Sequence, residues 1–270
     1  MAFADSSGTQ IYYDDRGKGE PVLLCLTGWC VHHTIFLPLA ERLSAQHRVL
    51  AMDWRGHGQS QSSDQDFGYA EMLADVLSVI QASGAQSVIP IAQAHGGWAA
   101  IALRRQLGER VPKMVCISWN PFFTSGNPLA PTFLRARQAL QDQTRWRETL
   151  EQMLTMWLRG APASVERHIR DEMESHGFED WARAGREISA MYAREGDPLQ
   201  ALSQLTPPVP VLHVYVEPHA AEYLSAQESF AREHSWFAVR RLEAVSHFPT
   251  LEVPDETARV IREFINWESA

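Results

Sequence analysis

The middle of the chain reads Ser87-Val88-Ile89-Pro90-Ile91-Ala92-Gln93-Ala94-His95-Gly96-Gly97, an apolar run that ends in a turn of small residues. An apolar run without alternation is typical of a strand covered on both faces of a parallel sheet. The turn leads into a segment of helical period that runs from Gly97 to Leu107. We therefore predict a buried strand, a sharp turn and a helix here.

The same succession of strand and helix recurs along the chain. Further apolar runs of this kind lie at residues 21–26, 49–52, 114–117 and 209–215, and residues 70–83 have helical period. Strands that alternate with helices indicate a doubly wound, mostly parallel sheet of the α/β class. Residues 10–15 precede these units, and we expect them to form an antiparallel hairpin at the sheet edge.

The alternation stops between residues 122 and 198. This region has no convincing strand, and its helical stretches carry Trp146, Trp157, Trp181 and Tyr192. We interpret it as a helical cap that is inserted into an α/β core made of residues 1–121 and 199–270. A last helix is expected at residues 255–267.

Composition limits the classes of function. The formal net charge of −9 argues against a nucleic-acid partner and against adsorption to anionic membranes, since both need a basic surface. The sequence shows neither a signal peptide nor an apolar run of about 18 residues. Three cysteines in a chain of 270 residues suggest no disulfide framework. We expect a cytoplasmic protein, either a monomer or a homodimer.

Four local patterns occur in a fixed order. They are Gly28-Trp29-Cys30, Asp53-Trp54-Arg55-Gly56-His57-Gly58-Gln59-Ser60, Ala92-Gln93-Ala94-His95-Gly96-Gly97 and Ser246-His247-Phe248-Pro249. Each pattern is weak alone, but together and in this order they resemble the α/β-hydrolases. The resemblance implies that the first and third patterns supply an oxyanion hole and that His247 is the catalytic histidine.

The third pattern lacks the usual nucleophile. A nucleophile elbow reads G-x-S-x-G, with the serine on a strained turn at the head of a helix. Ala94 holds the serine position here and Ala92 replaces the first glycine, so this position offers no side-chain oxygen that could attack a carbonyl. The N–H of His95 remains at the helix N-terminus, where it can stabilise negative charge. Cys30 lies on another loop and is a poor substitute nucleophile.

His247 is therefore a base with no nucleophile beside it. A histidine that titrates near neutral pH is a suitable general base for an acidic hydroxyl of a substrate; the alternative is a relic kept for packing. Glu217 follows the predicted strand at 209–215 and is our first choice for the acid that orients His247. Ser118, one strand earlier, is the second choice, although a hydroxyl would raise the pKa of an imidazole less than a carboxylate does.

Aromatic side chains concentrate on segments that are expected to face the pocket. They are Trp29, Trp119, Phe122, Phe123 and Trp157. Each one can be explained by core packing, but together they suit a flat aromatic ligand. We place His33 among the substrate-binding residues. His32 and His33 have no third ligand at zinc spacing, so we expect no metal site.

The chain resembles a narrower group, the cofactor-independent ring-cleaving dioxygenases of 3-hydroxy-4-oxoquinolines and quinaldines. The resemblance covers nearly the whole chain and rests chiefly on Gly-Trp-Cys at 28–30 and Asp-Trp-Arg-Gly-His at 53–57. It implies that a histidine removes the 3-hydroxyl proton and that the anion then reacts directly with dioxygen, with loss of carbon monoxide and no cofactor. It assigns His247 as the base, the N–H groups of Trp29 and His95 as oxyanion donors, and Trp157 as a wall of the ring pocket.

This sequence departs from the family pattern at three positions. Ala94 replaces an elbow serine, Ser118 stands at the position of the catalytic aspartate, and Val31 replaces the histidine after Gly-Trp-Cys. We therefore expect a dioxygenase for a hydroxylated aromatic N-heterocycle, with Glu217 in place of the aspartate. Two alternatives remain open: a non-catalytic protein that binds such a heterocycle, and a hydrolase with an unorthodox nucleophile or a water activated by His247.

Overall fold

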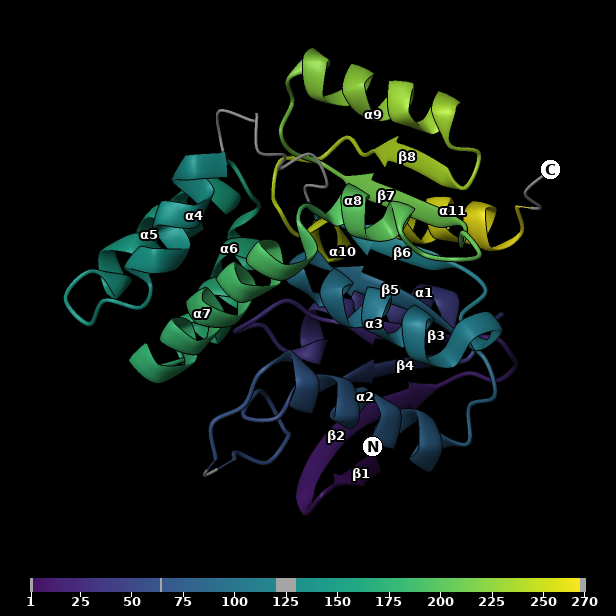
Figure 1. Ribbon diagram of the computed structural model, residues 1–270, viewed down its shortest axis with the longest axis horizontal. Helices are drawn as coiled ribbons and strands as arrows, with labels where there is room; N and C mark the ends of the chain where they lie inside the picture. Colours follow the sequence, from purple (N-terminus) through teal and green to yellow (C-terminus); the bar gives the residue numbers. More distant parts are fainter. Residues whose placement is uncertain (1, 64, 120–129, 268–270) are drawn as a thin grey trace.

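The computed structural model describes residues 2–63, 65–119 and 130–267. Its centre is an eight-stranded sheet with the order β1-β2-β4-β3-β5-β6-β7-β8 (Figure 1). The strands are β1 (Ala2–Ser6), β2 (Thr9–Arg16), β3 (Val22–Leu26), β4 (Val49–Met52), β5 (Val88–Gln93), β6 (Met114–Ile117), β7 (Val211–Tyr215) and β8 (Phe237–Arg241). The strands from β4 to β8 pair in parallel, whereas β1 and β2 form an antiparallel hairpin at one edge. The predicted α/β class and mostly parallel sheet are confirmed. The antiparallel hairpin lies at the predicted edge, but it consists of β1 and β2, and residues 10–15 form part of its second strand only.

Helices cover both faces of the sheet. On one face lie α2 (Tyr69–Ser83), α3 (Gly97–Leu107) and α8 (Pro198–Ser203), and on the other lie α1 (Leu37–Leu43) and α11 (Pro254–Ile265) (Figure 1). Short α10 (Pro249–Glu252) leads into α11, and α9 (Ala221–Glu233) packs beside β8 at the far edge. Three one-turn 3-10 helices complete the core: η1 (His33–Phe36), η2 (Ala94–Gly96) and η3 (Gly108–Arg110).

Four helices between β6 and α8 form the cap. They are α4 (Ala130–Ala139), α5 (Trp146–Trp157), α6 (Ala163–Met173) and α7 (Phe178–Glu195). The cap lies beyond the carboxyl ends of the parallel strands, at the left of Figure 1. An inserted helical cap is thus confirmed, while the bounds 122–198 stay a prediction because residue 122 lies outside the described residues.

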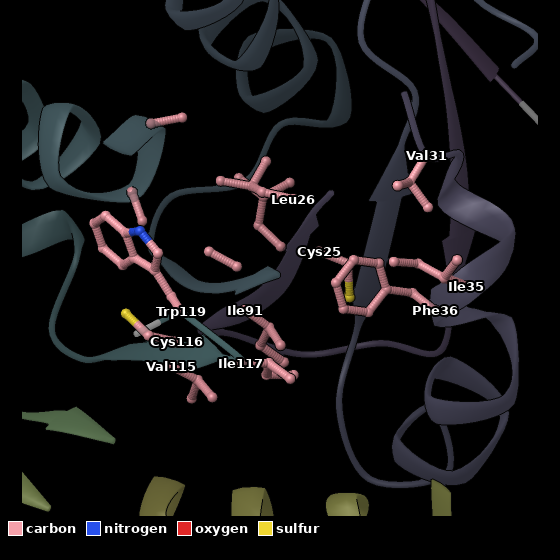
Figure 2. Packing of buried hydrophobic residues seen from close by; sticks show 14 of the residues in the cluster. Cys25, Leu26, Val31, Ile35, Phe36, Ile91, Val115, Cys116, Ile117 and Trp119 are labelled. Carbon is pink, nitrogen blue, oxygen red and sulfur yellow. The ribbon is translucent and has the colours of Figure 1, made fainter. Parts of the chain in front are cut away.

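The core is apolar, as the strand runs without alternation predict. Every residue of β3, β4, β5 and β6 is buried. Figure 2 shows Cys25, Ile91 and Ile117, from three neighbouring parallel strands, packed with Phe36 and Trp119 around them. This packing fixes the strand ends, and with them the loops that carry the site. Among the described residues, no helix is long and apolar enough to span a bilayer.

Candidate active site

The turn after β5 has the backbone of a nucleophile elbow. Ala94 has φ of +47°, a left-handed conformation that residues with a Cβ adopt rarely. Gly96 and Gly97 permit this turn: a Cβ on Gly96 would lie 2.6 Å from the carbonyl oxygen of Thr27, and one on Gly97 would overlap the ring of Trp119. The elbow therefore keeps its strained geometry although its side chain is only a methyl group.

A cavity of about 280 Å³ opens at this turn, between the strand ends and the cap. The part of its lining that comes from the core consists of Gly28, Trp29, Val31, Gln93, Ala94, His95, Ser118, Trp119, Glu217, Pro218, His247 and Phe248. The part that comes from the cap includes Phe133, Arg137, Met153, Met156, Trp157, Met173, Trp181, Ile188 and Tyr192. Most of the lining is apolar and aromatic, which suits a flat ligand in a preformed cavity.

His247 is held from several sides. Its Nδ1 lies 3.1 Å from Oε1 of Glu217, and its ring stacks on Trp157 with 5.3 Å between ring centroids and 19° between ring planes. Its backbone N–H donates to the carbonyl of Trp157 at 2.9 Å, and its own carbonyl accepts from Nε2 of Gln93 at 2.9 Å. The imidazole thus has a fixed orientation, and Nε2 has no protein partner among the described residues.

Ser118 lies at the end of β6 and also lines the cavity, with φ of +49°. Its hydroxyl is buried and has no hydrogen-bond partner in the described part of the chain. The hydrogen bond to His247 that we considered for Ser118 is therefore not formed. Of the two candidate partners, Glu217 and Ser118, only Glu217 contacts the imidazole.

Trp29 and His95 come from different loops but are linked by one side chain. Nε1 of Trp29 donates to the hydroxyl of Tyr69 at 3.0 Å, and that hydroxyl donates to the carbonyl of His95 at 3.1 Å. The N–H of His95 lies in the first turn of η2, where N–H groups have no partner within the helix. Tyr69 thereby ties together the two segments whose N–H groups are candidates for an oxyanion hole.

The ring of His95 faces the same cavity. Burial lowers the pKa of His95 well below its ordinary value, and the positive charge of Arg137 lowers it further. The ring is therefore neutral at pH 7, and its buried Nδ1 has no partner among the described residues. Oε1 of Gln93 and the hydroxyl of Ser118 are unpartnered in the same way. A cavity with several unsatisfied polar atoms is suited to a ligand that carries both donors and acceptors.

The prediction for His33 is wrong. His33 is buried and does not line the cavity, because Asp53 binds it: Nδ1 lies 2.8 Å from Oδ2 of Asp53, and the backbone N–H of His33 donates to Oδ1 at 2.7 Å. Phe122 and Phe123 lie outside the described residues. Trp119 and Trp157 do line the cavity.

The described residues include one cluster of possible metal ligands, all of them buried. Atoms of Cys30, His57 and His176 come within 4.8 Å of one another. However, Nε2 of His57 already accepts from the backbone N–H of Cys30, and Nδ1 bonds to the carbonyl of Arg55. Burial also raises the pKa of Cys30 well above its ordinary value, so it stays a thiol. The cluster is a hydrogen-bonded core contact between loop and cap.

Sequence reasoning missed three residues of the site. Gln93 anchors the His247 backbone, Tyr69 links the oxyanion segments, and Arg137 brings a buried charge to the cavity. Gln93 sits inside the elbow pattern and could have been examined there. Tyr69 and Arg137 belong to helices with no motif, and nothing local in the sequence distinguishes them.

Comparisons with known proteins agree with this geometry. A family model described as the alpha/beta hydrolase family matches residues 23–260. The chain is 36% identical over 255 residues to the 2-heptyl-3-hydroxy-4(1H)-quinolone dioxygenase of Mycobacteroides abscessus, with 93% of each chain covered. It is 35% identical over 274 residues to the 1H-3-hydroxy-4-oxoquinoline 2,4-dioxygenase of Pseudomonas putida, with 98% of this chain and 99% of that one covered.

A solved structure extends the likeness to three dimensions. It is described as the basis for recognition and ring cleavage of the Pseudomonas quinolone signal by an AqdC variant in complex with its substrate. Its TM-score to this chain is 0.90, at 33% identity and with 98% of each chain covered. Over its full length, this chain belongs to the 3-hydroxy-4-oxoquinoline 2,4-dioxygenase family of the α/β-hydrolase fold.

Proposed function

We propose that this protein is a ring-cleaving dioxygenase for a 3-hydroxy-4-quinolone-type aromatic N-heterocycle, and that it needs no cofactor. One observation carries the proposal. His247 binds Glu217 through Nδ1, while the elbow that shares its cavity holds the methyl group of Ala94. A base is present and a nucleophile is missing, which fits a reaction in which the substrate itself becomes the nucleophile.

The first step is a proton transfer. With Nδ1–H donating to Glu217, Nε2 of His247 carries the lone pair and accepts the proton of the substrate 3-hydroxyl. Glu217 stabilises the imidazolium that forms, and stacking on Trp157 keeps the ring in place. The substrate anion is electron-rich enough to reduce dioxygen directly, and its ring carbon C2 becomes bonded to oxygen.

The second step opens the ring. The peroxide attacks C4, the O–O bond breaks, and C3 leaves with its oxygen as carbon monoxide. Both atoms of dioxygen stay in the organic product: one in the amide carbonyl at C2, the other in the carboxylate at C4. Negative charge moves onto the C4 oxygen during this step, and the N–H groups of Trp29 and His95 are the donors that we assign to it. The hydroxyl of Tyr69, which bonds to the side chain of Trp29 and to the carbonyl of His95, holds the two segments that carry these donors together.

The other site residues bind the ring. Trp157 and Trp119 lie along the cavity as walls for a planar substrate, and Phe122 is proposed to join them on sequence grounds alone. Ala94 leaves space at the elbow, and Ser118 and Gln93 offer unpartnered polar atoms to the heterocycle. We also propose a cytoplasmic location, which the three buried, unbridged cysteines support, and a monomer or homodimer.

The test is a turnover measurement. Purified, chelator-treated protein is mixed with 3-hydroxy-4-quinolones that carry hydrogen or alkyl chains of increasing length at C2, and oxygen uptake and carbon monoxide are recorded together. We expect one carbon monoxide for each dioxygen consumed, and loss of both in His247→Ala. Tight binding without consumption would instead support a ligand-binding protein. Covalent labelling by a serine-directed phosphonate would support a hydrolase.

A further inference from the structure

Arg137, on α4 of the cap, lines the same cavity and is only 6% exposed. Its guanidinium lies 4.7 Å over the ring of Phe133, and Nη1 contacts Sδ of Met153 at 3.4 Å. Its Nε has no hydrogen-bond partner, and no carboxylate of the described residues pairs with it. Within the described part of the chain, Arg137 is therefore a buried cation without a counter-charge.

The other buried arginines are satisfied. Arg55 forms a two-pronged pair with Asp75, at 2.5 and 2.8 Å, and Arg104 donates to three backbone carbonyls. Burying a charge without a partner is costly, so proteins normally pair such groups. Arg137 is the exception, and it faces the cavity that His247 also lines. This position indicates that a ligand supplies the missing partner.

The residues around Arg137 offer no negative charge at neutral pH. Burial lowers the pKa of Arg137 to about 10, so the guanidinium stays charged at pH 7. Burial raises the pKa of Tyr192, of Tyr69 and of Cys30, so these neighbours stay neutral. His95, which also senses the charge of Arg137, is neutral as well. The one carboxylate among the described lining residues, Glu217, is bound to His247, which indicates that a ligand supplies the anion for Arg137.

We propose that the cavity binds an aromatic carboxylate and that Arg137 is the residue that binds it. A guanidinium matches a carboxylate in shape and charge, and such charge-assisted bonds are stronger than neutral ones. The carboxylate has two possible sources. The first is the carboxylate that forms at C4 when the ring opens, and this alternative rests on the proposed function. The second is a carboxylate substituent that the heterocycle already carries when it enters the cavity.

Calorimetry at pH 7 on the full chain tests the proposal without turnover. The probes are N-acetylanthranilate and its uncharged carboxamide, which have the same shape and differ in charge. We expect the wild type to prefer the carboxylate by about tenfold or more, as for other hydrogen bonds to charged groups. Arg137→Met should abolish this preference, and Arg137→Lys should keep part of it. Arg135→Met, an exposed change on the same helix, should leave it intact.

A second pair of probes separates the two sources. A 3-hydroxy-4-quinolone with a carboxylate on its benzo ring is compared, without oxygen, with the unsubstituted compound. If the wild type binds the carboxylated quinolone more tightly than the unsubstituted one, and Arg137→Met does not, Arg137 binds a substituent of the substrate. If the wild type prefers a carboxylate only in N-acetylanthranilate, Arg137 binds the group that ring opening forms. Either result supports the proposal.

Equal binding of charged and uncharged probes by the wild type, or an unchanged preference in Arg137→Met, would overturn the proposal. Folding is checked by thermal unfolding of the free protein, where Arg137→Met should be at least as stable as the wild type because it removes an unpaired buried charge. Oxygen uptake is measured separately. Carboxylate binding that depends on Arg137, without oxygen uptake, would reject the proposed function and keep this inference.

Discussion

Nδ1 of His247 donates to Oε1 of Glu217 at 3.1 Å, and this bond determines which nitrogen of the imidazole can act as a base. A ring whose Nδ1–H is bound by a carboxylate carries its lone pair on Nε2. Glu217 follows β7, whereas the position at which the family resemblance implies an aspartate, Ser118, follows β6. Strand β7 lies next to β6 in the sheet, so Glu217 reaches the imidazole of His247 from the strand beside the one that Ser118 follows.

Replacing His247 by alanine should lower kcat for oxygen uptake by a factor between about one hundred and ten thousand, the usual contribution of a general base. Substrate affinity should change far less, since Trp157 and the other walls remain. The comparison variant is His47→Ala, because His47 lies just before β4, at the end of the sheet remote from the cavity. Equal loss in both variants would mean that His247 has no specific role.

Replacing Glu217 by glutamine should lower kcat by about tenfold to a hundredfold and leave KM within a few-fold. The amide keeps the size of the side chain but cannot stabilise the imidazolium as a carboxylate does. Glu222→Gln, an exposed change in the first turn of α9, serves as the control. Full activity in Glu217→Gln would exclude Glu217 as the supporting acid.

Replacing Ala94 by serine should create a reactive nucleophile. Its φ of +47° already has the elbow conformation, and the new hydroxyl would share the cavity with His247. We expect a fluorophosphonate to label Ala94→Ser and not the wild type, with peptide mapping to identify residue 94. The double variant Ala94→Ser/His247→Ala should stay unlabelled. Failure to label the single variant would show that the hydroxyl at position 94 is not activated.

Buried His213 makes stability depend on pH. Burial lowers its pKa to about 4, partly opposed by the bond to Gln227. The unfolded chain binds a proton near pH 6.5, so the stability contributed by the neutral ring is present above that pH and is lost as the pH falls towards 4. We expect His213 alone to remove about 2 kcal/mol of the free energy of unfolding between pH 7 and pH 5.

Urea unfolding at the two pH values measures this loss. His213→Asn, which keeps an N–H donor for Gln227, should show a smaller fall in the free energy of unfolding than the wild type. For His219→Asn, a change at an exposed position, the free energy of unfolding should fall as much as it does for the wild type. Parallel curves for His213→Asn and the wild type would refute a low pKa for His213.

Much of the fold could be predicted because the buried parallel strands have an unmistakable pattern. Strands β4 and β6 end where the apolar runs at 49–52 and 114–117 end. Strand β8 was missed because it is an edge strand: Phe237 and Val239 are buried but alternate with Ala238 and exposed Arg240, so it lacks a continuous apolar run.

Site residues that directly follow strands could be predicted from the sequence. Contacts between segments far apart in the sequence could not. Glu217 and His247 both follow strands near one edge, so their meeting could be expected. The sequence cannot show that Asp53 binds His33, because that contact depends on how two separate loops pack. Arg137 could not be predicted as a site residue for a similar reason. An arginine on a helix normally faces water, and only the folded cap shows that Arg137 is buried.

The central claim is that His247 ionises the bound substrate before oxygen reacts. The most direct test is an anaerobic titration at pH 7, in which the absorption spectrum of a 3-hydroxy-4-quinolone is recorded as protein is added. We predict the spectrum of the 3-olate with the wild type and that of the neutral compound with His247→Ala, at matched saturation. A neutral spectrum with the wild type, or the same olate spectrum with both proteins, would contradict the account.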